Sequence, residues 1–248
     1  PNNGEVLGMD STDWYDLNNP RDLSLYYSEQ EIQDMIAFEE ENAEKEANGQ
    51  ETADYDEATG RQTRLNALNG LWRNFCISDT YEPGSTAKPM NVAAAYETNS
   101  ITDEDTFVCD GSQQVGGFQI KCAIYPNAHG TETAEDALKN SCNDALMQIA
   151  EKMGSENFLK YQQLFGFGSK TGIDLPGEAA GLIYSEENWN ETSLATSSFG
   201  QGYNVTMIQQ LAAFCSVVNG GYCYQPRVVS EITDSNGSVV ETIEPKML

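Results

Sequence analysis

The most constraining feature of the sequence is the segment 81–90, in which a Pro-Gly pair precedes a serine and then a lysine. The Pro-Gly pair interrupts any incoming element, and the alanine-rich run at 91–96 favours a helix directly after it. Ser85 would open that helix, with Lys88 one turn later on the same face. This arrangement suits nucleophilic catalysis, because a serine hydroxyl needs a nearby base and an amine can serve when burial lowers its pKa. The helix N-terminus would add backbone N–H groups that stabilise a developing oxyanion.

The Ser-x-x-Lys spacing has an ordinary alternative. On the order of one such match falls by chance in a chain of this length. Ser85 would then be a helix N-cap and Lys88 a surface lysine. The rest of the chain has to decide between the two interpretations.

Composition limits the possible partners. The 248 residues carry a formal net charge of −26, which argues against a nucleic acid or an anionic membrane surface as a partner, because both require a basic face. The length allows one large or two small domains. The sequence contains neither a signal peptide nor an apolar run long enough to cross a bilayer, so we expect any exporting segment to lie outside this chain.

The six cysteines show no zinc-binding pattern, because no C-x-x-C pair occurs, and we predict no metal and no cofactor. They are Cys76, Cys109, Cys122, Cys142, Cys215 and Cys223. Cys109 and Cys122 flank two glycine-containing turns, so a hairpin could bring them together. Reduced buried thiols are the default expectation and a Cys109–Cys122 bridge is the alternative; the sequence leaves the redox compartment open.

The apolar patterns and turn residues predict a mixed set of helices and strands. We expect strands at 5–9, 107–109 and 118–120, a hairpin formed by 227–233 and 238–243, and a Gly- and Pro-rich loop at 166–181. Helices are predicted at 65–72, at 133–153 with an interruption at 140–143, at 158–165 and at 206–218. The glutamate-rich segment 28–60 is expected to be a solvated helix or a flexible excursion.

A second motif favours the catalytic interpretation of Ser85 over the N-cap interpretation. Ser141-Cys142-Asn143 lies between two predicted helices, and a Ser-x-x-Lys followed by a Ser-x-Asn turn resembles the penicillin-recognising serine enzymes. The flanking segments strengthen the resemblance: GEVLGM at 4–9, YEPGSTAKP at 81–89, His129-Gly130 before NSCN at 140–143, FGFG at 165–168, DLPGE at 174–178 and SFGQG at 198–202. Together they are similar to the transpeptidase domain of class B penicillin-binding proteins, of the division or sporulation type in Gram-positive bacteria.

The resemblance implies an α/β fold, with an antiparallel sheet between helices and an all-helical lobe beside the cleft. Residues 1–248 would form a partial transpeptidase domain, incomplete at both ends, with 28–60 as an acidic excursion within it. Ser85 would be the nucleophile and Lys88 the base that accepts its proton. Ser141 would relay a proton toward the leaving amine, and Asn143 would hold both the substrate amide and the Lys88 side chain. The resemblance also implies a substrate-contacting turn formed by Gly200, Gln201 and Gly202.

The family's third motif, Lys-Thr/Ser-Gly, has one apparent match at Lys170-Thr171-Gly172. We do not assign it to catalysis, because no strand of useful length precedes it and relatives carry the catalytic triplet after the equivalent of the 227–243 hairpin. We therefore expect the catalytic triplet downstream of this chain. His129, the only histidine, lies in a Pro/Asn/Gly loop and is expected to be structural, which excludes a histidine triad.

The activity implied is peptidoglycan D,D-transpeptidation through a serine acyl-enzyme that β-lactams also form. The implied partners are stem peptides ending in D-Ala-D-Ala, β-lactams, and other cell-wall synthesis proteins through the parent protein. The implied location is the outer face of the cytoplasmic membrane, with an anchor N-terminal to this chain. Two alternatives stay open: a non-catalytic penicillin-binding sensor or scaffold, and a serine β-lactamase or D,D-carboxypeptidase.

Overall fold

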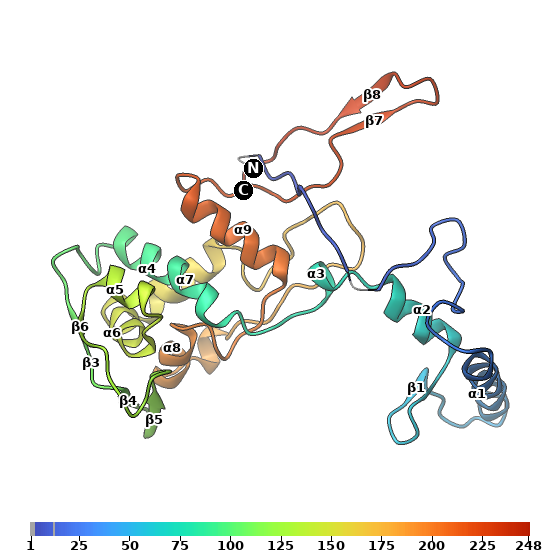
Figure 1. Ribbon diagram of the computed structural model, residues 1–248, viewed down its shortest axis with the longest axis horizontal. Helices are drawn as coiled ribbons and strands as arrows, with labels where there is room; N and C mark the ends of the chain where they lie inside the picture. The colour runs from blue at the N-terminus through green and yellow to red at the C-terminus, as the bar shows by residue number, and fades with distance from the viewer. Residues whose placement is uncertain (1–2, 12) are drawn as a thin grey trace. The chain divides into compact units, whose positions relative to one another are not determined.

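The computed structural model describes residues 3–11 and 13–248. The chain divides into two compact units (Figure 1). The smaller unit is Asp10–Phe75, and the larger one combines the N-terminal residues up to Met9 with Cys76–Leu248. Each unit has its own apolar cluster, so each is described by itself.

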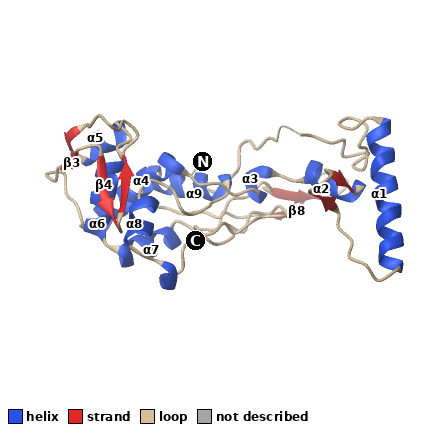
Figure 2. Ribbon diagram, turned by 90° about the horizontal axis from the view of Figure 1, so that it is seen from below, coloured by secondary structure: helices blue, strands red, loops and turns tan. Residues whose placement is uncertain are grey.

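The smaller unit is built around one long acidic helix, drawn as a single helix in Figure 2. Its elements are α1 (Glu29–Ala47), β1 (Tyr55–Asp56), β2 (Arg61–Gln62) and α2 (Arg64–Trp72). Ser28 caps α1 in a capping box with Glu31, which satisfies N–H groups that the first turn leaves free. Met35 and Phe38 are buried while most of the glutamates stay exposed, so part of the segment 28–60 is a solvated helix with a narrow apolar face.

That apolar face packs into a small core. The core residues are Leu23, Met35, Ala67, Leu68 and Leu71. Two ion pairs join α1 to the following elements: Arg61 to Glu41 at 2.8 Å and Arg64 to Glu39 at 2.7 Å. The predicted helix at 65–72 is confirmed as α2.

The larger unit is mainly helical. Its helices are α3 (Phe75–Ser78), the 3-10 turn η1 (Gly84–Ala87), α4 (Lys88–Glu97), α5 (Ala134–Lys139), α6 (Asn143–Met153), α7 (Ser155–Leu164), the 3-10 turn η2 (Glu186–Asn188), α8 (Glu191–Ser197) and α9 (Met207–Val218). The core lies where α4, α5, α6 and α7 meet (Figure 1), and includes Ala95, Leu146, Ile149 and Phe158. Threonine capping boxes at Thr133 and Thr206 start α5 and α9, which confirms the predicted helix starts there.

The strands form antiparallel pairs, and in the described residues no sheet has more than two strands. The pairs in the larger unit are β3 (Phe107–Cys109) with β6 (Gly130–Glu132), β4 (Ser112–Val115) with β5 (Phe118–Lys121), and β7 (Glu231–Thr233) with β8 (Val239–Thr242). The hairpin predicted within 227–243 is confirmed as β7–β8.

The strands predicted at 107–109 and 118–120 are confirmed as β3 and β5. They do not pair with each other, because β5 turns back onto β4 and the distant β6 pairs with β3 instead. The strand predicted at 5–9 is wrong. Residues 5–9 form no strand; only Glu5 makes a bridge, to Arg227, because the backbone hydrogen bonds of Gly4 and Val6 both go to that one residue.

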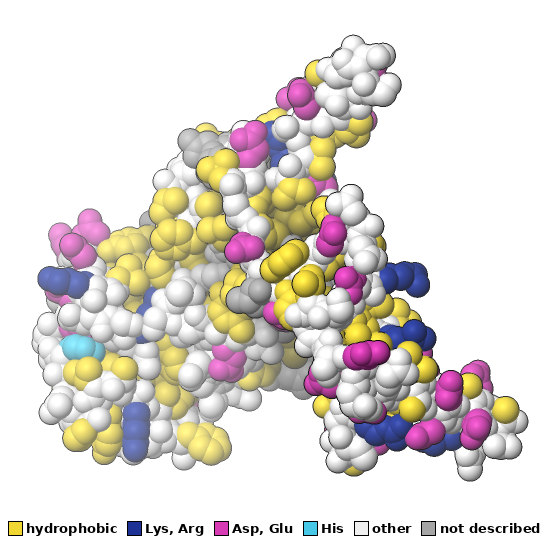
Figure 3. Space-filling view, turned by 45° about the vertical axis from the view of Figure 1, so that its right-hand side comes forward, with side chains coloured by type: hydrophobic (Ala, Val, Ile, Leu, Met, Phe, Trp, Pro, Cys, Tyr) yellow, Lys and Arg dark blue, Asp and Glu magenta, His cyan; other side chains and the backbone are white. Residues whose placement is uncertain are grey.

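No helix in the described part of the chain is long and apolar enough to cross a membrane. Acidic side chains are spread over the face shown in Figure 3 and not gathered in one patch. On that face the acidic charge marks no particular site.

Candidate active site

The segment 81–90 forms a tight turn that leads into a helix. Gly84 has a φ of +56°, which glycine adopts at little cost, and it begins the 3-10 turn η1 that contains Ser85. Lys88 is the first residue of α4, and the proline after it is compatible with a first helical turn. The predicted order of turn, serine, lysine and helix is confirmed, except that Ser85 lies in the 3-10 turn and not in α4 itself.

Lys88 is almost completely buried, with 1% of its surface exposed. Its ammonium donates to three oxygens of the Ser141–Asn143 turn: the Ser141 carbonyl at 2.7 Å, Ser141 Oγ at 2.9 Å and Asn143 Oδ1 at 2.7 Å. Ser141 Oγ in turn hydrogen-bonds to Ser85 Oγ at 2.8 Å. Among the described residues, the link between Lys88 and Ser85 thus runs through the Ser141 hydroxyl.

The Ser141–Asn143 turn joins α5 to α6. Ser141 has a φ of +52°, an unfavourable conformation for a residue with a Cβ, and it persists because both of its oxygens bind Lys88. Cys142 caps α6 with its sulfur, which accepts the N–H of Ala145 at 3.3 Å. Asn143 begins α6, so the helix start fixes the direction of its side chain.

Burial also sets the acid–base properties of the site. Removal from water lowers the pKa of Lys88 from 10.5 to about 8, although negative charge at Cys122 and Cys142 opposes the shift. A lysine with this pKa is partly neutral near neutral pH. It can therefore accept a proton that originates on a serine hydroxyl.

The turn predicted to contact substrate packs against the turn that contains Ser85. The Gly200 carbonyl accepts the N–H of Gly84 at 2.8 Å, and a Cβ on Gly200 would lie 2.1 Å from the Gly84 carbonyl oxygen. The N–H of Gly202 donates to Glu82 Oε1 at 2.8 Å. Gln201 lines an open cleft of about 750 Å³, whose lining includes Glu82, Tyr184, Asn190, Thr192 and Thr196.

Three polar residues that support the site were not assigned from the sequence. Glu82 fastens the Gly202 backbone, Asn91 donates to the Ser198 carbonyl at 2.8 Å, and Gln210 donates to the Thr86 carbonyl at 2.8 Å. Asn91 and Gln210 are buried side chains on α4 and α9. Their only sequence signal is a polar residue at a position that the helical period assigns to the apolar face.

The remaining motif residues lie in loops. Lys170, Thr171 and Gly172 form no strand, and the N–H groups of Thr171 and Gly172 donate to the buried carboxylate of Glu178 at 2.6 and 3.0 Å. The Gly172 carbonyl accepts from Gln225 Nε2. His129 contacts cysteine sulfurs, so the structure joins it to a cluster other than the Ser85–Lys88 chain.

Comparison with known proteins places this geometry in a family. The sequence matches the penicillin binding protein transpeptidase domain over residues 1–248. Stage V sporulation protein D of Bacillus subtilis is 41% identical over 163 residues, which are 65% of this chain and 25% of that protein. Peptidoglycan D,D-transpeptidase FtsI of Escherichia coli is 29% identical over 160 residues, or 64% of this chain and 26% of that protein.

Solved structures agree with the sequence matches. Penicillin-binding protein 3 of Mycobacterium tuberculosis in complex with aztreonam has a TM-score of 0.66 and 26% identity, and the likeness covers 74% of this chain and 41% of that one. The same protein in complex with ampicillin has a TM-score of 0.66 and 25% identity, over 76% and 42% of the two chains.

The chain spans about a quarter of the length of the curated relatives that it matches. Within that span, the family match extends over the whole chain, and the solved relatives share its mixed helical and strand fold. The chain belongs to the penicillin-binding protein transpeptidase domain family, among the class B proteins of division and sporulation.

Proposed function

We propose that this chain is part of a peptidoglycan D,D-transpeptidase that works through a serine acyl-enzyme. The observation that carries the proposal is the continuous hydrogen-bonded series from Ser85 through Ser141 to Lys88, with Asn143 as a further acceptor. Lys88 is buried and has a lowered pKa, so it can act as a base. Its link to the accessible Ser85 hydroxyl would activate that serine as a nucleophile.

In the first step, Ser85 Oγ attacks the carbonyl between the two terminal D-alanines of a stem peptide. Its proton passes through the Ser141 hydroxyl to neutral Lys88, and the carbonyl oxygen takes the negative charge. When the tetrahedral intermediate collapses, the carbon–nitrogen bond breaks and the proton returns through Ser141 to the departing D-alanine amine. An amine of a second stem peptide then attacks the ester carbon. The bond from that carbon to Ser85 Oγ breaks, a proton of the amine passes to Ser85 Oγ, and the new amide is the cross-link.

The substrate side of the proposal rests on the turn 200–202, which borders the open cleft through Gln201 and Gly202. Gly200, Gln201 and Gly202 pack against the Ser85 turn, and Gln201 faces the open cleft. We propose that this segment binds the stem peptide along its backbone, as a glycine-containing edge allows close approach. β-Lactams would acylate Ser85 by the same route, as the aztreonam and ampicillin complexes of structural relatives suggest.

The proposed setting is the outer face of the cytoplasmic membrane, where peptidoglycan is assembled, together with other cell-wall synthesis proteins. The relatives named for sporulation and for peptidoglycan transpeptidation support this setting.

A donor substrate analogue tests the chemistry. The 248-residue chain is incubated with an acyl-D-Ala-D-Ala thioester or depsipeptide, and both acyl-enzyme mass and released leaving group are followed. Acylation of Ser85 that disappears in Ser85→Ala is expected. Acyl transfer that persists in Ser85→Ala would refute the assignment, and acylation without transfer to an added D-amino acid would favour the sensor alternative.

A further inference from the structure

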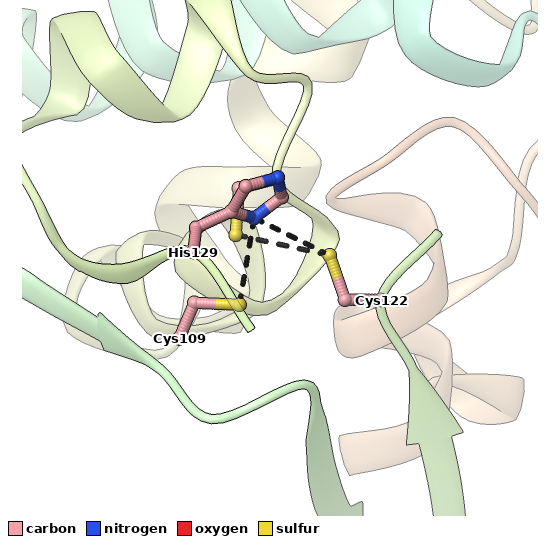
Figure 4. A group of neighbouring side chains, drawn as sticks. Cys109, Cys122 and His129 are labelled. Atoms are coloured by element: carbon pink, nitrogen blue, oxygen red, sulfur yellow. Dashed lines mark hydrogen bonds between the residues drawn. The ribbon is translucent and has the colours of Figure 1, made fainter. Parts of the chain in front are cut away.

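A second cluster of reactive side chains lies directly beside the Ser141–Asn143 turn. Cys109 ends β3, Cys122 follows β5, His129 precedes β6, and Cys142 caps α6. Their sulfur atoms and one His129 nitrogen all lie within 4.8 Å of one another. Figure 4 shows the imidazole of His129 directed between the sulfurs of Cys109 and Cys122.

The distances are those of ligands around a single ion. Cys122 Sγ lies 3.9 Å from Cys142 Sγ, and His129 Nδ1 lies 3.5 Å from Cys109 Sγ and 3.8 Å from Cys122 Sγ. Zinc bonds of about 2.3 Å to sulfur and about 2.0 Å to nitrogen, at tetrahedral angles, separate two sulfurs by about 3.8 Å and a sulfur from a nitrogen by about 3.5 Å. A disulfide would need about 2.05 Å, and all the cysteines are free.

Burial isolates the cluster from solvent. Cys109, Cys122 and Cys142 are exposed by 1%, 3% and 0%, while the His129 side chain retains 14% exposure. Three thiols from separate elements have thus been brought to one point, although a hydrophobic core would be filled as well by alanine or valine.

The surroundings also suit metal-bound thiolates. The N–H of Ala145 donates to Cys142 Sγ at 3.3 Å. A metal ion would displace the protons of the thiols on binding.

A buried carboxylate lies at the edge of the cluster. Glu132 is 3% exposed, and its Oε2 has no hydrogen-bond partner among the described residues. This oxygen lies 3.8 Å from His129 Nδ1, at the edge of the cluster.

We propose that Cys109, Cys122, Cys142 and His129 Nδ1 bind one structural Zn²⁺ ion. Three thiolates and one imidazole in a closed tetrahedral arrangement are the ligand set that zinc favours. No zinc pattern is visible in the sequence because the four ligands come from four separate segments and include no closely spaced pair. The β3–β6 and β4–β5 pairings bring them together.

The site would act on the active centre through Cys142. This residue stands between Ser141 and Asn143, whose oxygens hold Lys88. A metal bond to Cys142 would fix a turn in which Ser141 has a φ of +52°. We therefore assign the ion a positioning role for the Ser85–Ser141–Lys88 series, a consequence that rests on the proposed function, whereas metal binding does not.

Metal content tests the site itself. The chain, purified under reducing conditions, is analysed by elemental mass spectrometry and titrated with Co²⁺ after chelator treatment. One zinc per chain and a tetrahedral cobalt spectrum with thiolate charge-transfer bands are expected. Cys109→Ser, Cys122→Ser and Cys142→Ser should each lose the metal or change the cobalt spectrum, while Cys215→Ser, outside the cluster, should match the wild type.

The opposite results are equally clear. A metal-free chain that shows no cobalt thiolate bands would overturn the proposal. So would a mass 2 Da below the reduced value under non-reducing conditions with a mapped bridge among these cysteines, because the thiols would then serve as a disulfide pair. Cobalt spectra of the wild-type chain decide the question even if a cysteine variant does not fold.

Acylation by penicillin tests the positioning role. Chelator treatment should slow acylation of the wild-type chain at least tenfold, and added Zn²⁺ should restore it. Ser85→Ala should bind zinc normally but form no adduct, which separates failure of the metal site from failure of the proposed function. Equal acylation rates with and without bound zinc would remove the positioning role.

Discussion

Burial of the Lys88 side chain determines whether its amine can act as a base. In water its amine would be protonated at neutral pH, but burial lowers its pKa to about 8. Its three acceptors keep the charged form tolerable, so the residue can exchange a proton without leaving its position. The ability of Lys88 to act as a base near neutral pH therefore depends on its surroundings and not only on its being a lysine.

This pKa predicts the pH dependence of acylation. Only the neutral amine accepts a proton, so the acylation rate constant should rise about tenfold per pH unit below pH 8 and level off above it. The measurement is the rate of penicillin adduct formation from pH 6 to 10, corrected for spontaneous β-lactam hydrolysis in protein-free blanks. A rate that stays flat or falls across pH 8 would exclude Lys88 as the base.

Asn143 supplies one of the three oxygens around the Lys88 ammonium. Asn143→Ala should lower the free energy of unfolding by about 1–3 kcal/mol, because a buried donor loses its acceptor. Acylation should also slow by about tenfold or more, since each 1.4 kcal/mol at the transition state is tenfold in rate.

Asn157→Ala is the matched control for that variant. Asn157 is also half-buried, and its side chain donates to the Met153 carbonyl. It should lose stability to a similar extent but acylate like the wild type. If the two variants acylate equally fast, Asn143 has no part in the active site.

At the scale of elements, the packing of two turns determines where Ser85 lies. Gly200 has a φ of +83°, and a Cβ there would lie 2.1 Å from the Gly84 carbonyl oxygen. Gly237 has the same φ in an open hairpin with nothing within 4 Å. Gly237→Ala should cost only about 1–2 kcal/mol for the left-handed conformation.

Gly200→Ala should cost clearly more than Gly237→Ala, because it adds a backbone clash to the same conformational penalty. It should also displace the Ser85 turn and nearly abolish acylation. Denaturant unfolding and penicillin labelling of the two variants side by side measure both effects. Equal losses of stability and unchanged labelling in Gly200→Ala would show that the contact between the turns is unimportant.

The sequence predicted the local elements better than their pairing. Caps such as Thr133 and Thr206 mark helix starts by chemistry that acts within three residues, so α5 and α9 could be placed. The pairing of β3 with β6 depends on contacts across an intervening hairpin, which local patterns do not encode. For the same reason the expected strand at 5–9 gave only one bridge to Arg227.

At the scale of the whole molecule, the fold unites motifs that are far apart in sequence. Ser85, Lys88, Ser141 and Asn143 could be singled out by family resemblance, and the structure brings all four together. The linkage of Ser85 to Lys88 through Ser141 could not be anticipated, nor could the bracing by Glu82, Asn91 and Gln210. The thiol cluster could not be predicted from the sequence either, because its members come together only when β3, β5 and α6 are assembled.

Ser85 is the proposed nucleophile, and intact-mass analysis after incubation with a penicillin tests this role most directly. The wild-type chain should gain the mass of one penicillin, mapped by peptide digestion to Ser85. Ser85→Ala should gain none, while Ser235→Ala, in the exposed β7–β8 turn, should label like the wild type. An adduct that persists on Ser85→Ala, or that maps to another residue of the wild type, would contradict the account.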